Sequence, residues 1–90
     1  MDWDVVSFVL ASEVRFRVLV RLNSGEATPS RLAADLDAPI SHVSKALSEL
    51  SARKLVRLLT PNRKKSRFYG IDDHGRAVLT EIHRVTGRKA

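Results

Sequence analysis

Short polar and basic side chains are concentrated in two neighbouring stretches of the sequence. The first stretch, 41–53, sets small polar and basic residues between regularly spaced apolar ones: Ser41, His42, Ser44, Lys45 and Ser48. The second stretch, 60–67, holds a run of cations: Arg63, Lys64, Lys65 and Arg67. Serine hydroxyls allow close approach to phosphates and base edges, and lysine and arginine bind phosphate oxygens and guanine. These side chains therefore favour binding of a nucleic acid duplex over bond-making chemistry.

The positive charge of the chain lies in the same region. The sequence has 16 Lys and Arg against 10 Asp and Glu, a formal net charge of +6. Segment 38–71 holds eight basic residues and one acid, Glu49, for +7, whereas 1–37 and 72–90 carry −2 and +1. A cluster confined to one segment creates the local positive potential that a polyanion-binding face needs. The alternative is an ordinary solvated basic surface.

Length and composition exclude several classes of protein. A chain of 90 residues buries one modest core, so we expect a single domain over 1–90. The absence of cysteine excludes disulfides, thiolate metal sites and thiol nucleophiles. Without a glycine-rich phosphate loop, a nucleophile elbow or paired carboxylates, the sequence predicts no enzyme activity and no cofactor. It also lacks an apolar run of the ~20 residues that span a bilayer and a basic signal-peptide head, which predicts a cytoplasmic protein without membrane association.

One metal site is conceivable from the residue types alone. His74, His83, Asp72 and Asp73 could assemble a zinc site across a dimer. Their spacing is not diagnostic, however, and the two aspartates fit the start of a helix. We therefore predict no metal site.

Apolar spacing indicates which elements carry the polar stretches. Segment 2–22 has no proline or glycine and predicts one or two helices, with Ser12 as the cap of a second one. Thr28 and Pro29 are typical of an N-cap and a first helical residue, and they open a predicted helix-turn-helix over 29–54. A break at 37–39 separates a short helix from a second one that Ser41 would cap, and the expected core residues of this second helix are Ile40, Val43, Leu47 and Leu50.

After residue 54 the spacing of the apolar residues changes from one typical of a helix to one typical of extended strands. Two β-prone runs around a basic tip predict a hairpin over 55–71. Asp72 would cap a final helix over 73–86, whose expected buried stripe is Ala77, Val78, Leu79, Ile82 and Val85. The fold class is therefore mainly α with a β-hairpin wing.

This order of elements is what a reader of duplex DNA needs. An α-helix fits the major groove while the preceding helix crosses the backbone, so we expect helix 41–53 in the major groove. The basic wing, 60–67, would lie on the backbone or in the minor groove and supply affinity without sequence information. The expected DNA contacts are Thr28, Ser30, Arg31, Ser41, His42, Ser44, Lys45, Ser48, Arg63, Lys64, Lys65 and Arg67.

Five segments carry a resemblance to a known family. In chain order they are VRFRVL at 14–19, PSRLA at 29–33, ISHVSKALSEL at 40–50, RFYGI at 67–71 and GRAVL at 75–79. Together they resemble the winged helix-turn-helix regulators of the ArsR and MarR type, especially their small archaeal and bacterial relatives. The resemblance implies a winged-helix domain, a homodimer and transcription regulation by binding a promoter operator. The chain lacks the cysteine pair of the metal-sensing members, which argues against metal sensing.

Two alternatives concern the partners of the chain. The first predicted helix is apolar on two faces, so we expect it and the final helix to form a dimer interface from Trp3, Val6, Leu10, Ile82 and Val85. Coverage of both faces within one domain is the alternative. For function, the alternative is a winged-helix module whose basic face binds an acidic protein instead of DNA.

Overall fold

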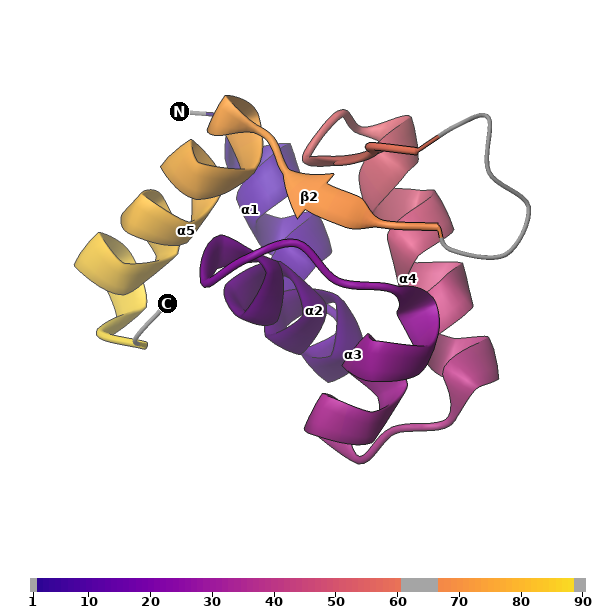
Figure 1. Ribbon diagram of the computed structural model, residues 1–90. Helices are drawn as coiled ribbons and strands as arrows, with labels where there is room; N and C mark the ends of the chain where they lie inside the picture. Colours follow the sequence, from indigo (N-terminus) through magenta and orange to yellow (C-terminus); the bar gives the residue numbers. More distant parts are fainter. Residues whose placement is uncertain (1, 61–66, 89–90) are drawn as a thin grey trace.

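Five helices and a two-stranded hairpin make up the chain in the computed structural model, which describes residues 2–60 and 67–88. The elements are α1 (Trp3–Leu10), α2 (Glu13–Asn23), α3 (Pro29–Leu36), α4 (Ile40–Ala52), β1 (Val56–Leu58), β2 (Tyr69–Ile71) and α5 (Asp73–Thr86). Figure 1 shows α5 on one side of α1 and α2, with α3 and α4 on the other. The prediction of a mainly α fold with a β-hairpin wing is confirmed. Arg63, Lys64 and Lys65 lie outside the described residues.

Side-chain caps divide the N-terminal helical segment in two. The Asp2 carboxylate accepts a hydrogen bond from the backbone N–H of Asp4 at 2.9 Å and starts α1. The Ser12 hydroxyl accepts from the N–H of Arg15 at 3.2 Å and starts α2, as predicted. Each oxygen satisfies a helical N–H group that has no partner within its own helix.

The helix-turn-helix begins as the sequence predicted, but α4 starts differently. The Thr28 hydroxyl accepts from the N–H of Arg31 at 3.1 Å, and Pro29 is the first residue of α3. The expected cap of α4 by Ser41 is wrong, because the N-cap is Pro39 and no side chain caps this helix. Ser41 lies inside the first turn and is exposed.

The buried apolar residues form one core, to which every helix contributes. From α4 the core takes Val43, Ala46, Leu47 and Leu50, whereas Ile40 is 50% exposed. The prediction that Ile40 is a core residue is therefore wrong. At 3.6 residues per turn the buried stripe of α4 is centred on residues 43, 46, 47 and 50, and Ile40 falls at its edge in the terminal turn.

The core also absorbs two residues that we expected at a dimer interface. Val6 of α1 and Ile82 of α5 are 2% and 0% exposed in the single chain. Neither presents surface to a second subunit, so their assignment to an interface is wrong, and at Val6 the alternative of coverage within the domain holds. Ala77 and Val85 of α5, expected in its buried stripe, are exposed.

The wing is joined to the helix-turn-helix through its second strand. β1 and β2 are antiparallel, with Val56 opposite Ile71 and Leu58 opposite Tyr69. On the other side of β2, Tyr69 exchanges two backbone hydrogen bonds with Ala27, at 3.1 and 2.9 Å. Because Ala27 directly precedes the cap of α3, the base of the wing is fixed against the start of that helix.

A left-handed residue after α4 and a close approach of α5 mark the two ends of the wing. Lys54, just after α4, has a φ of 61°, in the left-handed region that favours glycine. Gly75 lies where α5 meets β1, and a Cβ at this position would be 2.3 Å from the Leu55 carbonyl oxygen. Asp72 is the N-cap of α5, as predicted, although its side chain makes no capping hydrogen bond. Its carboxylate pairs with Arg57 of β1 at 3.2 Å instead.

Candidate nucleic-acid interface

The solvent-facing side of α4 is built from short polar side chains and one lysine. Ser41, Ser44, Lys45 and Ser48 are all exposed, opposite the buried stripe of the helix. His42 is exposed as well. Because the serines are short, the backbone of α4 is accessible to a surface that approaches it closely.

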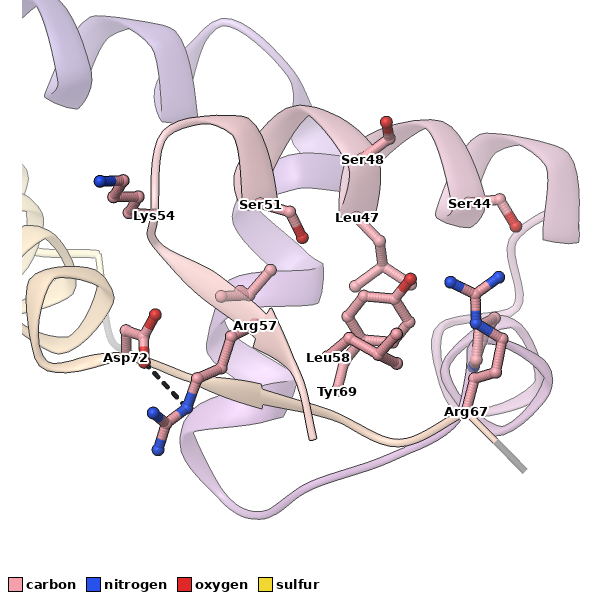
Figure 2. Close-up of a pocket in the computed structure, with 12 residues that line it drawn as sticks. Ser44, Leu47, Ser48, Ser51, Lys54, Arg57, Leu58, Arg67, Tyr69 and Asp72 are labelled. Carbon is pink, nitrogen blue, oxygen red and sulfur yellow. Dashed lines mark ion pairs between the residues drawn. The ribbon is translucent and has the colours of Figure 1, made fainter. Parts of the chain in front are cut away.

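A groove of about 640 Å³ runs between α4 and the wing. Figure 2 shows Ser44 and Ser51 of α4 pointing toward the hairpin, while Ser48 points away from it. Arg67 lies toward the Ser44 end of the groove, and Arg57 lies toward the other end (Figure 2). The residues that line the groove are Pro29, Ser44, Leu47, Ser48, Ser51, Lys54, Val56, Arg57, Leu58, Arg67, Tyr69 and Asp72.

Some of the predicted site residues line the groove, and others lie on a second flank of α4. Ser44, Ser48 and Arg67 line the groove, with Pro29 from the start of α3. His42 and Lys45 instead line a separate depression between α4 and the start of α2. The expected contacts therefore occupy both flanks of α4.

The predicted site residues at the start of α3 differ in the hydrogen bonds that their side chains make within the chain. The Thr28 hydroxyl caps the helix, and Ser30 is exposed. Arg31 donates to Asp35 at 3.1 Å, with its side chain 69% exposed. Arg21 donates to the same carboxylate at 3.0 Å, and these bonds from Arg21 and Arg31 lower the pKa of Asp35 below its ordinary value. The carboxylate thus accepts hydrogen bonds from two guanidinium groups.

Glu49 is the acid of the basic segment, and a guanidinium compensates its charge. Arg15 of α2 donates to the two Glu49 oxygens at 3.2 and 3.3 Å and to the carbonyl oxygen of Phe8 at 2.6 Å. The hydrogen bond from Arg15 lowers the pKa of Glu49, and the charge of Lys45 acts in the same direction. The guanidinium groups of Arg15 and Arg53 lie 4.1 and 4.2 Å from the centre of the Phe8 ring. The carboxylate therefore adds little negative potential beside Lys45.

Sequence reasoning missed several residues of the groove. Ser51 continues the helical spacing of Ser44 and Ser48, which is a signal that could have found it. Lys54 and Arg57 were counted in the basic segment but not assigned to the site. Tyr69 gave no such signal, because an aromatic residue in a β-prone run equally suggests core packing.

The described residues hold neither a metal cluster nor a spanning helix. Over 2–60 and 67–88, no group of three or more His, Cys, Asp or Glu could hold a metal ion. None of the helices in this part of the chain is long and apolar enough to cross a membrane.

A helix-turn-helix followed by a two-stranded hairpin and a further helix defines a winged-helix domain, and comparison with solved structures confirms this fold. A mutant of MarR from E. coli complexed with operator DNA superposes with a TM-score of 0.77, at 23% identity, covering 91% of this chain and 60% of that one. Reduced HlyU from Vibrio cholerae gives 0.72 at 24% identity, covering 94% and 90%. ZitR from Lactococcus lactis in complex with DNA gives 0.67 at 20% identity, covering 76% and 47%.

These comparisons bear on the fold and on the length of the chain. The chain spans about half the length of ZitR and 60% of that of MarR. The resemblance to MarR-type regulators is supported by these structures, and at such identities the likeness is one of fold. No protein-family model and no curated protein sequence matches the chain.

Proposed function

We propose that the chain is a sequence-specific, double-stranded DNA-binding transcription regulator. In this proposal α4 enters the major groove, and the wing lies on the backbone or in the minor groove. The observation that carries the proposal is the exposed serine and lysine face of α4 beside a groove that Arg67 and Arg57 line, within a segment of net charge +7. Two proteins of the same fold, MarR and ZitR, are described in complex with DNA.

The two parts of the interface have different tasks in this proposal. Ser44 and Lys45 of α4 reach base edges and contribute sequence preference. Arg67, with the cations of the tip at 63–65, binds phosphates and contributes affinity for any duplex. Thr28, Ser30 and Arg31 at the start of α3 place that helix on the backbone, as in other helix-turn-helix proteins.

Fluorescence anisotropy at several salt concentrations tests this division. We expect Ser44→Ala and Lys45→Ala to change which duplexes are preferred. Arg67→Ala should weaken binding to all duplexes alike and lower the salt slope by about one unit, because one phosphate contact is lost. Arg84→Ala is the matched control, since it removes an α5 arginine that pairs with Glu81. An Arg67 variant that keeps the wild-type slope contradicts the assignment of the wing.

An acidic protein partner is the second candidate, because the same basic face would attract it. The two functions differ in affinity for duplex DNA at physiological salt. Sub-micromolar binding supports the DNA-binding function. Binding no tighter than to a neutral polymer would favour the protein-interaction module.

We also propose that the regulator is a homodimer joined through α1 and α5. Trp3 and Val85 are 53% and 48% exposed, so they offer apolar surface to a second subunit, and Leu10 is partly buried. These three residues remain from the interface that the sequence suggested. Sedimentation equilibrium should give a dimer for the wild type and a monomer for Trp3→Glu. A monomeric wild type would contradict the proposal.

A further inference from the structure

Ile40 is an exposed apolar residue that neither the core nor the proposed dimer interface explains. Over the described residues four large apolar side chains are exposed, and they are Trp3, Ile40, Leu59 and Val85. Trp3 and Val85 belong to α1 and α5, and Leu59 follows the first strand of the wing. Ile40 is the first residue of α4, the helix that the proposed function places in the major groove.

The residues around Ile40 leave its side chain prominent. In a helix, residues four apart share a face, so Ile40 stands one turn before Ser44, which lines the groove. Side chains of a helix tilt toward its N-terminus, so the Ile40 side chain is directed toward the N-terminal end of α4. The next residue, Ser41, is short and exposed. The branched side chain of Ile40 therefore extends beyond its serine neighbours.

In the major groove of DNA, the thymine C5-methyl is the apolar group that such a side chain matches. Apart from the small C5–H of cytosine, the other groups at the groove edge of the bases are hydrogen-bond donors and acceptors, for which serine and lysine are suited. An isoleucine placed among serines adds an apolar contact to a face that otherwise offers only polar ones. The net charge of +7 on segment 38–71 makes a duplex a better occupant of this face than another basic copy of the chain.

We propose that Ile40 contacts the methyl group of a thymine and so determines base preference at one position of each half-site. This inference rests on the proposed function of the same face. It assigns to Ile40 an apolar contact that is distinct from the polar contacts of Ser44 and Lys45. It also predicts that the preference is independent of salt, because Ile40 carries no charge.

Replacement of thymine by deoxyuridine tests the contact, because it removes the methyl group and keeps the base pair. Duplexes selected by the wild type from a random pool are substituted one thymine at a time and titrated. We expect the wild type to lose about three- to fourfold in affinity at one thymine of each half-site, as burial of one methyl group implies. Ile40→Ser should bind the thymine and deoxyuridine duplexes equally at that position, and its salt slope should equal that of the wild type.

Two further measurements make the outcomes decisive. Arg84→Ala, an α5 variant outside the proposed DNA-binding face, is the control and should retain the wild-type response to deoxyuridine. Because Ile40 is exposed, Ile40→Ser should unfold within a few degrees of the wild type, so a change in binding is not a folding defect.

Each other outcome overturns the inference in a recognisable way. If the wild type is indifferent to deoxyuridine at every position, or Ile40→Ser responds as the wild type does, Ile40 does not contact a methyl group, and DNA binding stands. If Ile40→Ser instead converts a dimer to a monomer, Ile40 belongs to a subunit contact. If the wild type binds no duplex, both the proposed function and this inference are wrong.

Discussion

Replacement of Lys54 by glycine should stabilise the protein. α4 ends with two hydrogen bonds, from Lys54 N to Ser51 O and from Leu55 N to Leu50 O, each 3.0 Å long. These bonds hold Lys54 at a φ of 61°. A side chain in this conformation brings its Cβ close to the following carbonyl, whereas glycine has no Cβ.

The size of the effect follows from two opposing terms. Relief of the left-handed conformation gains about 1–2 kcal/mol, and the greater freedom of glycine in the unfolded chain costs about 0.4–1 kcal/mol. The net gain in the free energy of unfolding is therefore about 0.5–1 kcal/mol. A chain of 90 residues unfolds with an entropy of about 0.2 kcal/mol/K, so Tm should rise by about 3–5 °C.

Thermal unfolding of Lys54→Gly and Lys54→Ala separates the backbone from the side chain. Lys54→Ala removes the amine but keeps the Cβ, so we expect it to show no comparable gain. The difference in Tm between the two variants isolates the conformational term. If Lys54→Gly is no more stable than Lys54→Ala, the left-handed backbone at this position carries no strain and the argument is refuted.

Two other predictions concern close approach and charge. Gly75→Ala should lower the free energy of unfolding by about 1–3 kcal/mol, because the new Cβ would lie 2.3 Å from the Leu55 carbonyl oxygen. This loss should exceed the gain from the better helix propensity of alanine, and urea denaturation measures it. Stability equal to that of the wild type would show that α5 shifts freely. The hydrogen bond from Arg21 lowers the pKa of Asp35 in the folded state, so its contribution to stability is present above the unfolded-state pKa of about 4 and is lost as the pH falls through the folded-state pKa. The stability difference between the wild type and Asp35→Asn should therefore shrink from pH 7 to pH 2, and a constant difference would contradict this origin.

Local signals in the sequence predicted most of the helix boundaries. Ser12 starts α2, and Thr28 with Pro29 starts α3, because capping depends on residues within one turn of each other. The same local logic failed at Ser41, and at Asp72 it identified the N-cap residue without a capping hydrogen bond. α4 begins after a proline without a side-chain cap, and Arg57 from another element takes the Asp72 carboxylate.

Contacts between residues that are distant in the sequence could not be predicted from the spacing of apolar residues. The sequence identified Glu49 as the one acid of the basic segment but not its partner Arg15, which lies on another helix. Ile40 fits the apolar spacing of α4, but burial depends on whether a neighbouring element covers the end of the helix, which spacing does not encode. The groove combines residues of α3, α4 and the wing. The sequence predicted that α4 and the wing would form the site, but it did not predict all of the residues that line the groove.

The backbone pairing of Ala27 with Tyr69 has a consequence for the order of folding. β1 and β2 are close in sequence, and so are α3 and α4, so these pairs form through local contacts. In the sequence, Ala27 comes before α3 and Tyr69 comes after α4. The two hydrogen bonds between them therefore close a long loop of the chain. We expect this closure late in folding, after the helices and the hairpin have formed. The spacing between α4 and the wing is then the last part of the proposed DNA-binding surface to form, so we expect duplex binding to appear only when folding is complete.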